Sequence, residues 1–398
     1  MQKHDQDFIR RKNRITVFEL IKNSSPLSRA EIARLTGMSP TTVSRIVSEL
    51  HSQSFMREIE QITSSVGRKA VLLQVNPRSV LSVGVEIDKS SIRIGIVDLD
   101  GKIISDKQME RAGNEDALIT LERIAKGLLV LLEQEGLDKQ NVVGVGVGLP
   151  GIVDYSTGTV LFSAQLGWKR TEISSVLQKL TGLEVAVDNE LKVKALAEHL
   201  YGSARGSKRS VLIGFGSGVG SSLIIDGEVY RGETNSAGEI GHTVIDPNGI
   251  LCECGKVGCL QTYIAEASLI EQANKVKPIT TLEELFQAKN NGDFWAANIL
   301  DRAMTFVAVT VSNIACMYNP DTVILSGKLV ERFAEVREFI AEKCMGQFVW
   351  EPLRGTFQIV YSTLAGDGVV IGSGLLAQNL FLDIDRQLEQ ADHLTLNH

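Results

Sequence analysis

The chain has 398 residues, enough for two or three domains that each bury a core of their own. Its net charge of −7 is low for its length, and 43% of its residues are hydrophobic, as in an ordinary globular protein. No segment is expected to approach the apolar run of a membrane span, and the polar N-terminus does not resemble a signal peptide, so we expect a cytoplasmic protein with no membrane partner.

The N-terminal segment carries the positive charge of the chain. Residues 1–75 hold 12 Lys and Arg against 7 Asp and Glu, whereas the remaining residues hold 29 against 41. Lysine and arginine supply most of the non-specific affinity of proteins for nucleic acid, so only this segment is expected to meet a polyanion. The five cysteines of a chain expected in the cytoplasm argue against a disulfide framework.

Two helices are predicted at the start of the chain. The first spans about 7–23 and turns one apolar stripe inward, formed by Phe8, Ile15, Phe18 and Ile21. Ser28 and Glu31 have the spacing of a capping box, which opens the second helix. This helix ends at Gly37, which can take the left-handed conformation that a tight turn needs.

The next predicted helix has one apolar and one polar face. Ser39 is expected as its N-cap and Pro40 as its first helical residue. Its buried face carries Val43, Ile46, Val47 and Leu50, and its exposed N-terminal face carries Thr41, Thr42, Ser44 and Arg45. Short hydroxyls and a guanidinium can reach base edges and phosphates, so the helix pair predicts a helix-turn-helix that enters the major groove of double-stranded DNA.

Two strands, at about 55–62 and 70–75, are predicted after this helix. The loop between them is expected to be a wing, with Arg68 and Lys69 at its tip for the phosphates or the minor groove. The alternative is a helical hairpin that binds another protein. The caps, the turn glycine, the polar face and the basic wing together favour a winged helix-turn-helix that binds DNA.

From residue 79 the pattern changes to β-alternation and is repeated. Strands are predicted at 80–87, 92–97 and 103 onward, and again at 211–215, 221–225 and 229–230, each set followed by helical stretches at 115–135 or at 265–275 and 295–318. Duplicated β-β-β-α-β-α lobes with a cleft between them are typical of the α/β fold of sugar kinases, actin and heat-shock ATPases. We therefore expect a winged helix-turn-helix followed by this two-lobed, actin-like (ribonuclease H-like) fold.

In that fold the first hairpin of each lobe presents backbone amides to nucleotide phosphates, which requires glycine. The second hairpin, Gly214 to Gly220, has four glycines, whereas the first, Glu86 to Ser91, has none. Glu86 and Asp88 would instead repel phosphate by more than Lys89 could compensate. The sequence therefore predicts a nucleotide site that no longer functions.

One histidine and three cysteines predict a metal site. His242 precedes Cys252, Cys254 and Cys259, and one imidazole with three thiolates makes the closed tetrahedral set of structural zinc. The alternative is a group of reduced core cysteines. Cys316 and Cys344 lie apart from this group and are expected to be small buried hydrophobes. The metal would hold the loop that aims Glu239 into the cleft, where a carboxylate suits the adjacent hydroxyls of a polyol.

These motifs together resemble those of the ROK family (repressors, open reading frames, kinases), in its branch of DNA-binding, sugar-responsive repressors. The resemblance covers 1–78 as the winged helix and 79–380 as the kinase-like body. It implies a first lobe at 79–190, to which a helix at about 368–382 returns, and a second lobe at 191–367 with the zinc loop and a dimerisation surface. It also implies a homodimer or a dimer of dimers whose two heads change spacing when sugar binds.

Residue by residue, the resemblance implies a sugar site with substitutions. Asn189, Glu239 and His242 match the positions that hold the sugar, but Glu190 stands where the kinases have a catalytic aspartate. The extra methylene would displace a general base. Gln261 replaces a sugar-binding glutamate and Gln165 an asparagine. The stretch 148–154 matches the cleft loop of the family and is either a sugar contact or a strand-end turn.

We therefore predict a non-enzymatic regulator, most simply a repressor of carbohydrate genes, that binds a palindromic operator and a pentose or hexose such as xylose. Two alternatives stay open. The first is an active ATP-dependent sugar kinase that carries a DNA-binding head. The second is a regulator whose effector is a partner protein, which the substitutions at Gln165 and Gln261 allow.

Overall fold

In the computed structural model, which describes residues 2–60, 71–216 and 218–383, the chain begins with three helices. These are α1 (Gln2–Ser24), α2 (Arg29–Thr36) and α3 (Pro40–Ser52). The capping box of Ser28 and Glu31 is present, and Gly37 ends α2 with a φ of 70°. The side chain of Ser39 caps α3, so the three predicted helices and their boundary signals are confirmed.

The three helices share one apolar core. It contains the predicted stripe of α3, Val43, Ile46, Val47 and Leu50, and from α1 it contains Val17, Phe18 and Ile21. The prediction that Ile15 faces inward is wrong, because its side chain is 38% exposed. On α1 the buried stripe runs through positions 17, 18 and 21, and position 15 lies outside it. The side chain of Phe8 lies outside the described residues.

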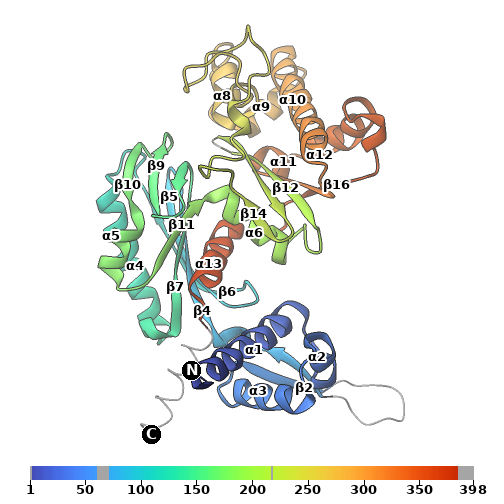
Figure 1. The fold of residues 1–398 in the computed structure, drawn as a ribbon. Coiled ribbons are helices and arrows are strands. Elements are labelled where there is room, and N and C mark those ends of the chain that lie inside the picture. Colours follow the sequence, from blue (N-terminus) through green and yellow to red (C-terminus); the bar gives the residue numbers. More distant parts are fainter. Residues whose placement is uncertain (1, 61–70, 217, 384–398) are drawn as a thin grey trace.

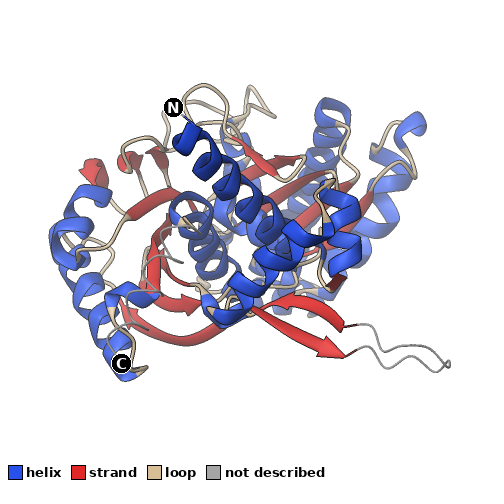
Figure 2. Cartoon of the chain, turned by 60° about the horizontal axis from the view of Figure 1, so that its bottom comes forward, coloured by secondary structure: helices blue, strands red, loops and turns tan. Residues whose placement is uncertain are grey.

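A small antiparallel sheet completes this N-terminal unit, which we call the head (residues 2–79). Its strands are β1 (Leu27–Ser28), β2 (Met56–Glu60) and β3 (Val71–Val75), in the order β1-β3-β2. Figure 2 shows the β2–β3 hairpin extending beyond the helices of the head. The predicted wing loop, with Arg68 and Lys69, lies outside the described residues.

The rest of the chain, which we call the body, contains the same five-stranded sheet twice (Figure 1). The first sheet has the strand order β11-β7-β4-β5-β6 and the second the order β16-β15-β12-β13-β14. In each sheet the first strand of the lobe lies in the centre, and the second and third strands follow it on the same side. The strands of the first are β4 (Leu81–Ile87), β5 (Ser91–Val97), β6 (Ile103–Glu110), β7 (Val142–Leu149) and β11 (Val185–Asn189). Those of the second are β12 (Arg209–Phe215), β13 (Val219–Ile225), β14 (Glu228–Tyr230), β15 (Thr322–Ser326) and β16 (Gln358–Tyr361). The predicted duplication and the fold class are confirmed.

Helices cover both sheets and separate them. On the first lobe lie α4 (Ala117–Gln134) and α5 (Ile173–Thr181), and beside them a three-stranded sheet of β8 (Ile152–Asp154), β9 (Thr159–Ser163) and β10 (Trp168–Glu172). The second lobe carries α7 (Gln261–Ile264), α8 (Glu266–Asn274), α9 (Leu282–Asn290), α10 (Phe294–Tyr318), α11 (Lys328–Arg332) and α12 (Ala334–Phe339). Between the two sheets lie α6 (Glu190–Tyr201) and α13 (Gly368–Phe381), packed against each other (Figure 1).

Two glycines explain how closely α13 approaches the first sheet. A Cβ added to Gly84 would lie 1.9 Å from the carbonyl oxygen of Val370, and one added to Gly146 would lie 1.8 Å from that of Ser373. Any side chain at these positions would therefore push the helix away from β4 and β7. This contact brings the C-terminal helix back to the first lobe.

The helix α10 has the length and hydropathy of a membrane span. The expectation that no segment approaches such a run is therefore wrong on composition. Its residues Leu300, Met304, Val307 and Val311 are buried in the core of the second lobe, and 56% of its most apolar window is buried inside the protein. A long helix packed on several sides is apolar nearly all round, which explains its composition.

The head and the first lobe share part of one core. Val80 at the end of the linker and Leu99 in the β5–β6 turn are buried together with the apolar residues of α1, α3 and β3. The amide of Leu99 also donates a hydrogen bond to the carbonyl of Pro77, at 3.1 Å. The head is thus attached through side-chain packing as well as through the chain itself.

Candidate functional site

The N-terminal turns of α3 present an exposed polar surface. Thr41, Ser44 and Arg45 are exposed there, as predicted for a helix that enters a groove. Thr42 is half-buried, and its hydroxyl lies 2.8 Å from the hydroxyl of Ser39, so these two side chains also complete the helix cap. The polar face is therefore a rigid one, because the cap holds the turn from which its side chains project.

Two arginines of α1 fix the opposite end of α3. Glu49 accepts hydrogen bonds from Arg14 at 2.7 Å and from Arg10 at 3.2 Å. The partners are 35 positions apart in the Arg14 pair and 39 apart in the Arg10 pair. Both pairs neutralise a carboxylate on α3, the helix predicted to enter the DNA groove. The helix therefore keeps its orientation relative to α1.

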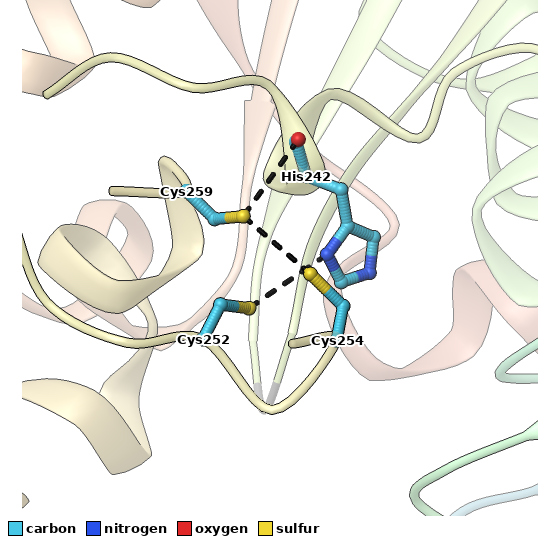
Figure 3. A group of neighbouring side chains, drawn as sticks. All are labelled: His242, Cys252, Cys254 and Cys259. Atoms are coloured by element: carbon cyan, nitrogen blue, oxygen red, sulfur yellow. Dashed lines mark hydrogen bonds between the residues drawn. The ribbon is translucent and has the colours of Figure 1, made fainter. Parts of the chain in front are cut away.

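The four predicted metal ligands lie together beside the cleft. His242 ends a short 3₁₀ turn (Ile240–His242), while Cys252, Cys254 and Cys259 come from the loop that follows. Their ligand atoms all lie within 4.8 Å of one another, with Cys254 Sγ 3.6 Å from Cys259 Sγ and Cys252 Sγ 3.9 Å from His242 Nδ1. Figure 3 shows that Nδ1 is on the side of the imidazole ring facing the sulfurs.

This geometry fits a tetrahedral metal ion. Zinc–sulfur bonds of about 2.3 Å place two sulfurs about 3.8 Å apart in a tetrahedron, close to the observed spacing. The backbone N–H of Lys256 lowers the pKa of the Cys254 thiol to about 7, which favours the thiolate that binds metal. The predicted cluster is therefore confirmed as a set that can hold a metal. The alternative of buried core thiols does not describe Cys254, which is exposed.

The two remaining cysteines differ from each other. Cys344 is buried, as predicted. Cys316 is exposed, so the prediction that it is a small buried hydrophobe is wrong. It lies in the last turn of α10, where the helix leaves the core and neighbouring Met317 is 70% exposed.

A cavity of about 730 Å³ lies between the two lobes. This volume is within the range of about 300–1,000 Å³ that is usual for small-molecule sites. All four residues predicted to bind sugar line it, namely Asn189, Glu190, Glu239 and His242, and so do Gln165 and Gln261. From the 148–154 loop the cavity wall includes Pro150, Gly151 and Ile152. The sugar-binding candidates are therefore brought to one place.

Asn189 has a structural role in addition to lining the cavity. Its Oδ1 accepts a hydrogen bond from the amide of Leu191 at 2.9 Å, which caps α6, and its Nδ2 donates to the carbonyl of Gly151 at 3.1 Å. Among the described residues its Nδ2 has this one acceptor, so its second hydrogen can be donated to a ligand. Asp154, by contrast, turns its carboxylate to the amides of Ser156 and Thr157, so the end of this loop is a turn.

Glu190 is the first residue of α6 and faces the cavity. Its pKa is raised to about 8, chiefly by burial and also by the charges of Glu239, Asp88 and Glu86. Its Oε2 is buried with no hydrogen-bond partner among the described residues. A buried carboxyl oxygen without a hydrogen-bond partner destabilises the protein. We therefore expect a ligand in the cavity to form a hydrogen bond with this oxygen.

The segment that carries Glu239 is fixed to the first lobe. Asp188, which is fully buried, accepts hydrogen bonds from Arg231 at 2.7 Å and from Asn235 at 3.0 Å. Asn235 also donates to the carbonyl of Val153, and its own carbonyl accepts from Lys192 at 2.6 Å. These contacts hold the 231–242 segment of the second lobe across the floor of the cleft.

Glu86 and Asp88 of the first hairpin line the end of the cavity at which the family resemblance places a nucleotide. Burial and the charge of Asp88 raise the pKa of Glu86 to about 7. On the second lobe, a Cβ added to Gly214 or Gly220 would lie 2.5 or 2.7 Å from the side chain of Leu191. These two glycines of the predicted phosphate loop therefore make room for a leucine. Ser217 of the same loop lies outside the described residues.

Sequence reasoning missed several cavity residues. Glu253 stands between two metal ligands, and its carboxylate accepts a hydrogen bond from Gln261 at 3.0 Å. Lys194 and Lys328 also line the cavity and pair with Glu331 and Glu266. The sequence signal that could have found Glu253 is its place between two metal ligands, in a turn that a bound metal would hold.

Comparison with protein-family models decides the family. The model described as "ROK family" matches residues 82–380, and the model described as "Winged helix-turn-helix DNA-binding" matches residues 10–53. The chain belongs to the ROK family. The predicted resemblance is thereby confirmed, and the head is a winged helix-turn-helix.

Curated relatives of this ROK protein include repressors. It is 26% identical over 380 residues to the xylose repressor of Bacillus subtilis, covering 96% of this chain and 98% of the relative. It is 28% identical over 359 residues to the xylose repressor of Caldicellulosiruptor bescii, covering 83% and 89%, and 24% identical over 369 residues to the N-acetylglucosamine repressor of Escherichia coli O157:H7, covering 90% of each.

Solved structures agree with this family fold. A ROK family transcriptional regulator described as a homologue of the E. coli MLC protein matches with a TM-score of 0.80 and 24% identity, covering 96% of this chain and 99% of that one. A ROK family glucokinase from Streptomyces griseus, in complex with glucose and AMPPNP, matches with a TM-score of 0.65 and 25% identity, covering 75% and 99%. The regulator spans the head and body of this chain, while the kinase covers three quarters of it.

Proposed function

We propose that this ROK protein is a sugar-responsive transcriptional regulator, most simply a repressor of genes for carbohydrate use, that works in the cytoplasm. The observation that carries the proposal is that one chain joins an exposed recognition helix to a cavity lined by groups that bind hydroxyls. The repressor names of the curated relatives support it. Xylose is one candidate among pentoses and hexoses, because two of these relatives are xylose repressors.

On the DNA side, Thr41, Thr42, Ser44 and Arg45 would read the major groove, and Ser39 would hold the turn. Arg68 and Lys69 of the wing would contact phosphates or the minor groove. A helix-turn-helix protein reads a palindrome with two copies, so we propose a homodimer or a dimer of dimers. Sedimentation of the protein alone and with operator DNA tests the number of copies.

On the ligand side, Asn189, Glu190, Glu239 and His242 would hold a small neutral sugar. His242, Cys252, Cys254 and Cys259 would hold one structural zinc ion, which supplies rigidity and no reaction chemistry, since four protein ligands leave no open position. The zinc would hold the loop between Glu239 and Gln261. A sugar can shift the regulator only by binding its two conformations with different affinity.

We further propose that the cleft senses sugar without phosphorylating it. Glu190 is longer than the aspartate that the family resemblance implies for a catalytic base. Leu191 occupies the space beside two glycines of the second hairpin, and Glu86 and Asp88 line the cavity at the first hairpin, where they would repel phosphates. A coupled assay with Mg-ATP and a panel of hexoses and pentoses tests this. Robust turnover would establish the rival function, an active sugar kinase.

The central experiment measures DNA and sugar together. Binding sites are first selected from random duplexes by the purified protein, and a palindromic consensus is expected. The affinity for that operator is then titrated with xylose, glucose, N-acetylglucosamine and inositol. A sugar that changes the operator affinity by fivefold or more would support the proposal, at the lower limit of about 1 kcal/mol for typical coupling. If no sugar in the panel binds, a partner protein becomes the better candidate effector.

A further inference from the structure

The side chain of Gln261 connects the metal cluster to the cavity. Gln261 is the first residue of α7, two positions after the last cysteine ligand, and it is 8% exposed. Its Nε2 lies 3.4 Å from Cys252 Sγ and 3.0 Å from Glu253 Oε1. One amide group therefore contacts a metal ligand and a carboxylate at the same time.

The chemistry of these partners fixes how the amide is oriented. A primary amide nitrogen carries two hydrogens, and a thiolate and a carboxylate both accept but do not donate. The nitrogen must therefore face Cys252 and Glu253, and each of its hydrogens has one acceptor. The carbonyl end then points the other way, toward Gly241, whose added Cβ would lie 3.2 Å from Gln261 Oε1.

The residues before and after Glu253 in the chain hold it in the cavity wall. Its neighbours Cys252 and Cys254 are both ligands of the cluster, so a bound metal leaves residue 253 little freedom to turn. The donor that the described residues offer its carboxylate is Gln261, which contacts Oε1. Its second oxygen is left for a hydroxyl in the cavity that Glu239 and His242 also line.

We propose that Glu253 is a direct ligand of the sugar, a third carboxylate beside Glu190 and Glu239, and that Gln261 is its positioning residue. The inference rests on the proposed function of the cavity as a sugar site. A carboxylate accepts strong hydrogen bonds from hydroxyls, and the carboxylates of Glu239 and Glu253 in one wall repel an anionic group. The ligand is therefore expected to be a neutral sugar, and a uronic acid is expected to be excluded.

The contact between Glu253 and Gln261 can be tested by exchanging the two side chains. In Glu253→Gln the carboxylate is lost, and in Gln261→Glu two carboxylates would be brought about 3 Å apart, where like charges repel. The double exchange, Glu253→Gln with Gln261→Glu, restores one carboxylate and one amide in the reverse positions. The thermal midpoint should recover part of its loss in the double variant, because the contact between positions 253 and 261 is rebuilt, whereas the donation to Cys252 Sγ is not.

Sugar affinity is compared between wild type and Glu253→Gln, because the double variant places a carboxylate at position 261, where the family resemblance implies a sugar-binding glutamate. For Glu253→Gln we expect the affinity to fall by about 10- to 100-fold, as for the loss of a hydrogen bond to a charged group. Deoxy analogues of the sugar identify the hydroxyl: the analogue that lacks it should bind wild type and Glu253→Gln equally. Glu271→Gln, an exposed glutamate on α8 that pairs with Lys275, is the matched control and should bind sugar normally.

The outcomes are distinguishable. Wild type is measured first by thermal shift and calorimetry with the neutral sugars named above. If wild type binds a sugar and Glu253→Gln binds it within twofold of the wild-type affinity, this inference is overturned while the proposed function stands. A wild-type protein that binds no sugar would overturn both. A loss of affinity in Glu253→Gln that comes with a loss of zinc would show that Glu253 serves only to hold the loop.

Discussion

The hydroxyl of Tyr201 donates a hydrogen bond to the backbone carbonyl of Leu99 across 2.6 Å. Leu99 is 3% exposed and lies in the core of the head, while Tyr201 is the last residue of α6. The first residue of that helix is Glu190, in the cavity wall. Twelve helical residues span about 18 Å, so α6 is a stiff connection between the ligand site and the core of the DNA-binding head.

Removing this hydroxyl should weaken the communication between sugar and DNA. In Tyr201→Phe the ring still packs against Gly101, whose added Cβ would lie 2.4 Å from it, but the contact with Leu99 is lost. We expect sugar affinity to change by less than about twofold and the sugar-induced change in operator affinity to fall by about 1 kcal/mol, roughly fivefold. Operator titrations with and without sugar measure this difference.

The control for this variant is another tyrosine of the second lobe. Tyr230 on β14 is 50% exposed, so Tyr230→Phe should leave the coupling unchanged. Coupling of wild-type size in Tyr201→Phe would mean that α6 transmits the signal without this hydrogen bond.

The metal cluster gives a second prediction. Purified protein should contain one zinc per chain, and Cys259→Ser should lose it because three ligands bind far more weakly than four. The loop from Glu239 to Gln261 would then loosen, which should lower the thermal midpoint by at least about 2–4 °C, the equivalent of 1 kcal/mol in a domain of 150–250 residues. Metal analysis and thermal unfolding measure the two effects.

Cys316→Ser is the matched control, because Cys316 is exposed and outside the cluster. It should retain the metal and the thermal midpoint. A wild-type chain with far less than one zinc would contradict the assignment of the cluster to a structural metal.

Much of this fold could be predicted from local patterns, because caps and alternation act over a few residues. Ser28, Glu31 and Gly37 set the boundaries of α2, and the spacing of the cysteines predicted the metal cluster. Contacts between distant residues could not be predicted in this way. Tyr201 and Leu99 are 102 positions apart, and the packing of Leu191 against Gly214 depends on how two lobes face each other.

Single faces were also harder to predict than whole elements. Ile15 fits an apolar stripe of α1 when only the sequence is considered, yet three other residues of the helix already fill the small core of the head. Glu253 could not be assigned to the cavity from the sequence, because the cysteine spacing predicts the metal ligands and not the side-chain direction of the residue between them.

The pH dependence of stability follows from Glu190. In the unfolded chain this carboxyl titrates near 4.5, and in the folded chain its pKa is raised to about 8 by burial. Between these two pH values the folded state keeps a proton that the unfolded state has lost, so the free energy of unfolding falls as pH rises. Glu190→Gln removes this pH-dependent loss of stability, because glutamine does not ionise. It should therefore have little effect near pH 4.5 and should stabilise the protein by about 2–4 kcal/mol at pH 8.5.

Denaturant unfolding of the sugar-free protein at pH 5 and pH 8.5 measures this difference. Glu133→Gln, an exposed glutamate on α4, makes the same chemical change at the surface and should have a small effect that does not vary with pH. An equal effect of Glu190→Gln at both pH values would mean that Glu190 is ionised throughout, with a partner that compensates its burial.

The recognition surface of α3 gives the last prediction. Arg45 is exposed beside Ser44 on the polar face of the helix, and a guanidinium can bind guanine through two hydrogen bonds. Arg45→Ala should therefore cost about 1–3 kcal/mol at one base pair of the operator and relax the preference there, while binding to unrelated DNA changes little. Competition between the operator and single-base variants measures this loss. Arg332→Ala removes another exposed arginine, which lies on the second lobe and pairs with Glu283, and should leave the preference intact. If Arg45→Ala instead weakens all sequences alike and lowers the salt dependence by about one ion, Arg45 contacts a phosphate and the bases are read by the hydroxyls of Thr41 and Ser44.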